Sequence, residues 1–205
     1  ASIAWMKSVI ESGADHPPFF AYLGPHAPHK PSQPATWYAD HPIASTPIVK
    51  DPYYNYLAVG KHGFLPLEPT ISAVDEAAIQ YEYGQRLRTL LSVDDLIRGI
   101  HGYLDSVGEW DRTYFLFTSD HGYNLGQFRV DSDKTQVYDH NTRVPMLFKG
   151  PGIAQGVKVP VVSSMADIAP TLLELIGADN AASEQMDGTS FAQQMLAPAA
   201  ESTAA

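Results

Sequence analysis

Two short polar stretches carry the side chains best suited to chemistry in this sequence. In the first, Ser-Asp-His-Gly, Asp120 and His121 stand side by side directly after an aromatic run. A carboxylate supplies a hard oxygen ligand and an imidazole a nitrogen ligand, so the pair could bind one divalent cation. Gly122 lets the backbone turn there without a clash at Cβ. A turn capped by Asp120, with His121 on the surface, accounts for these residues equally well.

The second stretch is Gly-Pro-His-Ala-Pro-His-Lys-Pro, in which His26 and His29 lie three residues apart. Prolines restrict the backbone and hold such a loop stiffly. Imidazoles fixed in this way suit proton transfer or the binding of an oxyanion. Taken alone, however, the stretch is more typical of an exposed loop that happens to be rich in histidine.

A third candidate is Lys134, which lies among acidic residues in RVDSDKTQVYDHNTRVP. Such a cluster is usually solvated, and its functional interpretation is a point charge directed at an anionic group. The sequence has no glycine motif for binding a nucleotide phosphate and no Gly-x-Ser-x-Gly nucleophile motif. It therefore offers acid, imidazole and ammonium groups without a recognisable nucleophile.

The elements that must position these groups predict an α/β fold, with helices flanking a mostly parallel sheet. The expected strands are short apolar runs, at 19–23, 114–118, 144–148 and 158–162. The expected helices carry apolar residues at steps of three and four, at 2–12, 76–107 and 167–177. Ligands of parallel sheets lie beyond the carboxyl ends of the strands. The histidine loop and the Asp-His turn, which each follow a strand, are therefore expected at the same edge.

The composition is that of a globular domain, with 205 residues, 44% of them hydrophobic, and a net charge of -10. An acidic chain argues against nucleic acid as a partner. No run approaches the roughly 20 apolar residues that a membrane-spanning helix needs. The absence of cysteine excludes disulfides and thiolate metal sites. We expect one domain over 1–198 with a long irregular loop segment at 32–80, and a loose tail at 199–205.

Several stretches, taken in chain order, resemble the sulfatase family of the alkaline phosphatase superfamily, and most of all its glucosamine-6-sulfatase branch. They are FFAYLGPHAPHKP, LRTLLSVDDLI, FTSDHGYNLGQF, DKTQVYDHNTRVPMLFKGPGI, SSMADIAPTLLELIG and MDGTSF. The resemblance runs from Phe19 to Phe191 and is interrupted by the segment 32–80. It implies an alkaline-phosphatase-like catalytic domain that hydrolyses a sulfate ester. The implied partner is a sulfated carbohydrate, an amino sugar or a glycosaminoglycan.

The family pattern also implies roles for individual residues. Asp120 and His121 would bind a divalent metal ion, calcium in most members, with manganese or zinc as the alternative. Lys134 would contact the sulfate. His29 would contact the sulfate as well and serve the leaving oxygen as a catalytic group.

Further residues fall at positions that family members use for the substrate. His26 would be a substrate-binding or supporting group, and Tyr123 and Asn124 would line the substrate pocket. Sulfated glycans are degraded in lysosomes, outside the cell or in a periplasm, so the resemblance implies one of these locations.

The sequence also departs from the family pattern. The family nucleophile is a formylglycine made from Cys or Ser within C/S-x-P-x-R, and neither a cysteine nor that motif occurs here. The amino-terminal pair of metal-binding aspartates is missing too. We therefore expect the carboxy-terminal part of a catalytic domain, incomplete at the N-terminus and inactive without an upstream segment of the same parent protein. The alternatives are a phosphonate or phosphodiester hydrolase of the same superfamily, or a non-catalytic truncated paralogue.

Overall fold

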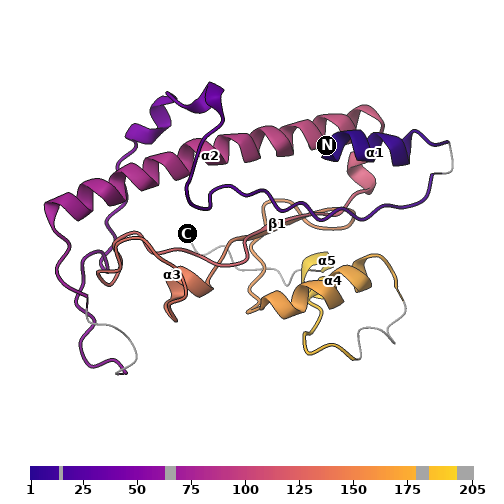
Figure 1. The fold of residues 1–205 in the computed structure, drawn as a ribbon. Helices are drawn as coiled ribbons and strands as arrows, with labels where there is room; N and C mark the ends of the chain where they lie inside the picture. Colours follow the sequence, from indigo (N-terminus) through magenta and orange to yellow (C-terminus); the bar gives the residue numbers. More distant parts are fainter. Residues whose placement is uncertain (14–15, 63–67, 179–184, 198–205) are drawn as a thin grey trace. The chain divides into compact units, whose positions relative to one another are not determined.

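A computed structural model describes residues 1–13, 16–62, 68–178 and 185–197 of the chain. The chain divides into two compact units, which are traced in Figure 1. The first unit comprises residues 1–110 and 121–144, and the second comprises 111–120 and 145–205. The predicted tail at 199–205 lies outside the described residues.

The first unit is built on the long helix α2, Ala73–Ser106. Its start is a capping box, in which the Ser72 hydroxyl accepts a hydrogen bond from the Asp75 amide and the Asp75 carboxylate accepts one from the Ser72 amide. Gly108, with φ +74°, follows its end in the left-handed conformation that terminates many helices. The helix predicted over 76–107 is therefore present and begins at residue 73.

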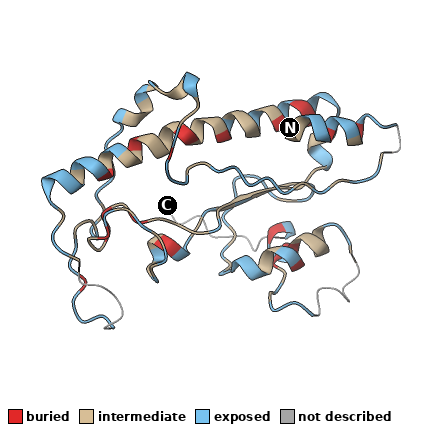
Figure 2. Ribbon diagram, viewed as in Figure 1, coloured by how far each residue is buried: buried red, intermediate tan, exposed pale blue. Residues whose placement is uncertain are grey.

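The apolar core of this unit lies between α1, Ser2–Ile10, and the C-terminal part of α2. Both helices carry buried residues, which Figure 2 colours red. Those that form this core are Met6, Ile10, Ile100, Tyr103 and Leu104. Burying an aliphatic side chain of this size contributes about 1.5–3 kcal/mol. The N-terminal helix is therefore fixed to α2 by hydrophobic contact, as its apolar spacing requires.

The described residues between α1 and α2 are irregular, apart from the two short 3₁₀ helices η1, Thr36–Tyr38, and η2, Pro42–Ser45. η2 packs closely on α2 at Gly84, where an added Cβ would lie 2.6 Å from the carbonyl oxygen of Ala44. The hydroxyl of Tyr38 donates a hydrogen bond of 2.6 Å to Asp95 on the same helix. The predicted irregular loop is thus tied to α2 by close packing and side-chain hydrogen bonds.

The second unit contains the strands β1, Phe115–Thr118, and β2, Met146–Lys149, which pair antiparallel. Phe115 lies opposite Lys149 and Thr118 opposite Met146. The chain then forms a 3₁₀ turn η4, Met165–Asp167, the helix α4, Ile168–Leu175, and the short helix α5, Ala192–Leu196. η3, Trp110–Arg112, lies where the chain passes from the first unit to the second.

The mixture of helices and strands agrees with the predicted α/β class, but the strands differ from the prediction in number and direction. The sheet described here has two antiparallel strands and no parallel pair. Residues 19–23 and 158–162 form no strand, and Phe20 and Tyr22 are 74% and 86% exposed. An apolar run does not specify the neighbour that a strand needs for its hydrogen-bonded ladder, which is why these two expectations were wrong.

Within the described residues, none of the helices combines the length and the apolar character needed to cross a bilayer.

Candidate functional site

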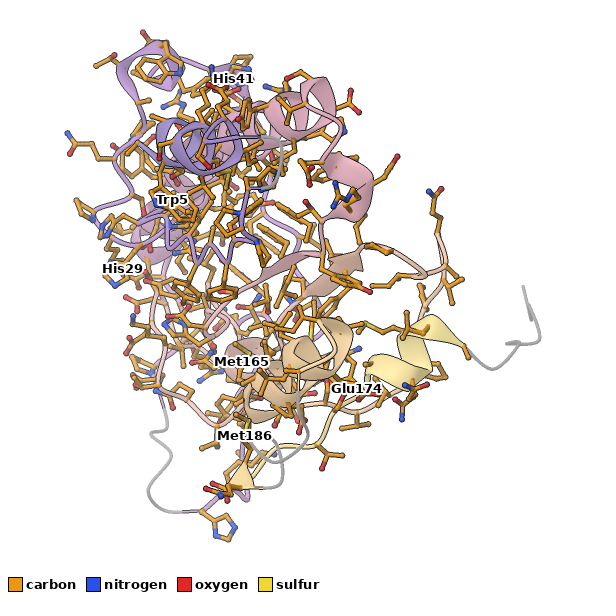
Figure 3. The ribbon with its side chains drawn as sticks, turned by 90° about the vertical axis from the view of Figure 1, so that its right-hand side faces the viewer. Trp5, His29, His41, Met165, Glu174 and Met186 are labelled. Atoms are coloured by element: carbon orange, nitrogen blue, oxygen red, sulfur yellow. The ribbon has the colours of Figure 1, made fainter. Side chains whose placement is uncertain are left out.

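Three of the predicted site residues meet in the first unit. The ammonium Nζ of Lys134 lies 3.3 Å from Nε2 of His29 and 3.2 Å from Nε2 of His121. These residues come from the proline-rich loop, the turn after β1, and the segment that precedes the short helix α3, Asp139–Thr142. His29 is exposed, as Figure 3 shows, whereas His121 and Lys134 are half-buried.

Backbone carbonyls fix the orientation of both imidazoles. Nδ1 of His29 lies 2.7 Å from the carbonyl oxygen of Lys30, and Nδ1 of His121 lies 2.8 Å from that of Gly122. Because a carbonyl oxygen only accepts hydrogen bonds, each Nδ1 must carry the hydrogen. In the neutral ring, Nε2 then holds the lone pair and accepts from Lys134. Both rings therefore present the same nitrogen to one ammonium, whose charge the neutral imidazoles do not cancel.

His26 lies next to this cluster. Its ring centroid is 5.1 Å from that of His29, and its carbonyl oxygen accepts a hydrogen bond of 2.9 Å from the His29 amide. The His26 side chain is exposed. The loop thus holds the two imidazoles together, while the role of His26 in substrate binding stays a prediction.

Tyr123 points to α2. Its hydroxyl lies 3.0 Å from a carboxylate oxygen of Glu82 and 3.2 Å from the hydroxyl of Ser132. The guanidinium of Arg86 lies 4.1 Å from the centroid of its ring. The side chain of Tyr123 is therefore held by contacts within the chain, and a contact with substrate stays a prediction.

Asn124 is fully buried. Its amide nitrogen donates to the carbonyl of Gln127 at 3.2 Å, and its amide oxygen accepts from Asn141. Its backbone exchanges hydrogen bonds of 2.8 and 3.3 Å with Asp133, which joins the segments that carry His121 and Lys134. In this geometry Asn124 holds two segments of the site together, and its predicted place in a substrate pocket gains no support.

The glycine after His121 has a physical reason that the sequence did not reveal. The amide of Gly122 donates to the carbonyl of Asn141 at 2.8 Å. A Cβ at this position would collide with the carbonyl oxygen of His140. Gly122 therefore permits a close approach of two backbone segments, and that approach places His121 beside the segment of Lys134.

Asp120 belongs to the second unit, as the last residue of its segment 111–120. The residue is exposed, and its carboxylate accepts a hydrogen bond of 3.3 Å from the Ser119 hydroxyl. The chemistry of Asp120 and His121 suits a divalent cation, since an imidazole whose Nδ1–H is bonded to a carbonyl is the usual form of a histidine ligand. The described part of the chain brings no three histidine, aspartate or glutamate side chains into a group that could hold a metal ion. The role of Asp120 and His121 as metal ligands therefore stays a prediction.

Contacts that the sequence did not reveal surround the cluster. Lys30 Nζ lies 3.2 Å from the carboxylate of Glu82. Burial lowers the pKa of Lys30, but the hydrogen bond and the charge of Glu82 outweigh this effect and raise the pKa above its usual value. The charge of Lys30 is thus balanced by a carboxylate, whereas Lys134 is directed at two imidazoles. The position of Lys30 next to His29 is evident in the sequence. Its partner Glu82 could not be predicted, because acidic residues are common on any solvated helix surface.

Comparisons with known proteins agree with this arrangement of motifs. A sequence model of the sulfatase family matches residues 4–178. N-acetylglucosamine-6-sulfatase of Homo sapiens is 34% identical over 177 residues, which cover 85% of this chain and 31% of that protein. The extracellular sulfatase SULF-1 homolog of Drosophila melanogaster is 32% identical over 196 residues, covering 95% of this chain and 17% of that protein.

A solved structure resembles the fold. The phosphonate monoester hydrolase of Silicibacter pomeroyi matches with a TM-score of 0.69 and 24% sequence identity, over 98% of this chain and 41% of that one. The chain spans 31% of the length of the human protein and 17% of that of the Drosophila melanogaster protein.

Proposed function

Because this chain belongs to the sulfatase family, we propose that it forms the part of a sulfuric ester hydrolase that binds the sulfate group and protonates the leaving oxygen. The observation that carries the proposal is the position of the Lys134 ammonium between Nε2 of His29 and Nε2 of His121. The ammonium can donate to an oxygen of a tetrahedral oxyanion, and each imidazole could donate from Nε2 only when that nitrogen also carries a proton.

Each group has a defined task in this proposal. As the S–O bond breaks, negative charge grows on the sulfate and leaving oxygens, and the fixed ammonium of Lys134 would offset it, an effect worth about 3–4 kcal/mol for a single well-placed donor. His29 is anchored through Nδ1; once it has also taken up a proton at Nε2, the imidazolium would deliver that proton to the departing alcohol and return to the neutral ring. General acid catalysis of this kind contributes roughly 10²–10⁴-fold to a rate.

We propose a divalent cation, calcium first and manganese or zinc as the alternative, at Asp120 and His121. When bound, it would supply positive charge that polarises the sulfate oxygens. This chain contains no cysteine, so we assign no formylglycine step to its residues. The groups present here account for binding, charge neutralisation and proton delivery.

For the substrate we propose the sulfate ester of an amino sugar, as a free sugar or within a glycosaminoglycan. The support is the identity of 34% to a protein named N-acetylglucosamine-6-sulfatase. We place the activity in a lysosome, a periplasm or outside the cell, and the match to an extracellular sulfatase supports this.

The proposal is tested by offering the chain, joined to the upstream segment that it is expected to need for turnover, an aryl sulfate, an aryl phosphonate monoester and glucosamine 6-sulfate in parallel, with calcium present. The proposal predicts hydrolysis of the two sulfate esters and slower turnover of the phosphonate. A preference for the phosphonate would instead support the phosphonate hydrolase named as the alternative. If no ester is hydrolysed and inorganic sulfate does not perturb the His29 signals, the chain has no sulfatase function.

A further inference from the structure

We propose that Glu82 is a positioning residue, which holds the three segments of the sulfate site in register by anchoring each of them to helix α2. This inference rests on the function proposed above. The contacts of Glu82 that carry this inference are with Lys30, Tyr123 and Ser132 rather than with His29, His121 or Lys134, so its effect passes through these neighbours.

The carboxylate of Glu82 receives hydrogen bonds or charge from each of the three segments. Lys30 Nζ lies 3.2 Å from one of its oxygens. The Tyr123 hydroxyl donates to the other oxygen at 3.0 Å, and the Ser132 hydroxyl donates to the same oxygen as Lys30. The Glu82 side chain is 15% exposed, so these bonds are partly shielded from competition by water.

Each of these partners lies very close in sequence to a site residue. Lys30 follows His29 directly, Tyr123 stands two positions after His121, and Ser132 stands two positions before Lys134. A residue advances the chain by at most about 3.6 Å. A shift at any of the three anchors is therefore passed to a site residue with little chain in between to absorb it.

The anchors are also linked to one another. Lys30 Nζ lies 3.4 Å from the Ser132 carbonyl oxygen, and the hydroxyls of Tyr123 and Ser132 are 3.2 Å apart. One turn further along α2, Arg86 donates to the Pro28 carbonyl at 3.2 Å and covers the ring of Tyr123. The helix therefore presents a continuous polar face that fixes the loop and the two later segments together.

Whether neutralising Glu82 strengthens or weakens sulfate binding distinguishes a positioning role from a purely electrostatic one. Glu82 is an anion near a site that is proposed to bind an anion. If it acted only through its charge, its neutralisation would strengthen sulfate binding, because like charges repel. If it acts by positioning, neutralisation breaks the pair with Lys30 and weakens one anchor, so sulfate binding falls.

The test compares Glu82→Gln with Glu76→Gln, which removes the same charge from the same helix where Glu76 pairs with Lys50. Sulfate affinity is measured by titration with inorganic sulfate at constant ionic strength, and the imidazole carbon–proton NMR signals of His29 and His121 are recorded without sulfate. We expect Glu82→Gln to weaken sulfate binding at least about tenfold, since displacement of a site by 1 Å can cost about a hundredfold. Both histidine signals should move, and Glu76→Gln should change neither readout.

Sulfate binding by Glu82→Gln that equals or exceeds that of the unmodified chain, with unmoved histidine signals, would overturn the inference. If Glu82→Gln shows no thermal unfolding transition and is therefore not folded, Ser132→Ala replaces it in the test. This variant removes one anchor without changing the charge. Ser132→Ala should also move the NMR signals of His29 and His121, and unmoved signals would again refute positioning. If the unmodified chain binds no sulfate, the proposed function fails, while the histidine signals still decide the role of Glu82.

Discussion

Nζ of Lys134 lies 3.3 Å from Nε2 of His29, although 105 positions separate them in the sequence. Nothing local brings such groups together, so the fold of the first unit must do so. The contact also fixes what each group can do. Nδ1 of His29 is hydrogen-bonded to a backbone carbonyl, so Nε2 is the nitrogen that can gain or lose a proton. Nε2 faces the Lys134 ammonium, which is proposed to hold the sulfate.

Replacement of His29 by alanine should slow hydrolysis most for substrates with a poor leaving group. An alkyl or sugar alcohol needs a proton as it departs, whereas a phenolate with electron-withdrawing groups departs without one. We expect a loss of roughly 10²–10⁴-fold in kcat on a sugar sulfate and a clearly smaller loss on a nitrophenyl sulfate. Steady-state kinetics with both substrates provide their own control, and equal losses on the two would show that His29 does not act as the general acid.

Replacement of Asp120 by asparagine should weaken the response to the metal. If Asp120 contributes a carboxylate ligand, calcium should restore activity to the chelator-treated protein with a half-maximal concentration at least about tenfold higher in the variant. Manganese and zinc are titrated in parallel to decide between the proposed cations. The neighbouring Asp111, which lies 3.6 Å from Lys149, gives a matched Asp→Asn control, and an unchanged calcium response in Asp120→Asn would refute the ligand assignment.

Two glycines of α2 should respond to alanine in opposite directions. At Gly84 the new Cβ would lie 2.6 Å from the Ala44 carbonyl oxygen, whereas at Gly102 it would meet nothing within 4 Å. Gly102→Ala should stabilise the chain by about 0.5–1 kcal/mol through helix propensity, and Gly84→Ala should destabilise it by about 1–3 kcal/mol through overpacking. Urea unfolding measures both, and equal stabilities would show that η2 does not pack on α2 as described.

Asp167 should make the stability of the second unit depend on pH in the acidic range. The amides of Ser164 and Thr189 donate to its carboxylate at 2.6 and 2.7 Å, and these bonds lower the pKa of Asp167. A lowered pKa in the folded state means that the stabilisation is complete above the unfolded value of about 3.9 and is lost as the pH falls through the folded value.

The measurement is the thermal unfolding midpoint as a function of pH, for the unmodified chain and for Asp167→Asn. The variant should be less stable near neutral pH, and the two curves should converge in acid. Parallel curves down to about pH 2 would show that the carboxylate bonds contribute no stability.

The helices α1, α2 and α4 could be predicted from the sequence because their signals are local, whereas the short helices α3 and α5 were not predicted. The apolar spacing of α2 and the glycine after it predicted the helix, but its start at the Ser72–Asp75 capping box was not predicted. The strands could not be predicted in the same way. The runs at 19–23 and 115–118 look alike in composition, but only the second pairs with another segment, Met146–Lys149, and the direction of that pairing is set by tertiary structure.

The site divides in a similar way. The family-like motifs led to His29, His121 and Lys134, and their meeting was expected before any geometry was known. Glu82 could not be found, because its role depends on partners that are distant in the sequence, such as Tyr123 at a separation of 41 and Ser132 at a separation of 50. Gly122 was expected at a turn. Its close approach to the carbonyl of His140 could not be predicted from the sequence either.

The central claim is that Lys134 holds the sulfate, and a binding titration tests it without requiring turnover. Inorganic sulfate is titrated into the unmodified chain, Lys134→Met and Lys158→Met, the last of which removes an equal charge from an exposed position in the second unit. We predict that sulfate shifts the NMR signals of His29 and His121 in the unmodified chain and in Lys158→Met, and that Lys134→Met binds at least about tenfold more weakly. Undiminished binding by Lys134→Met would contradict the account.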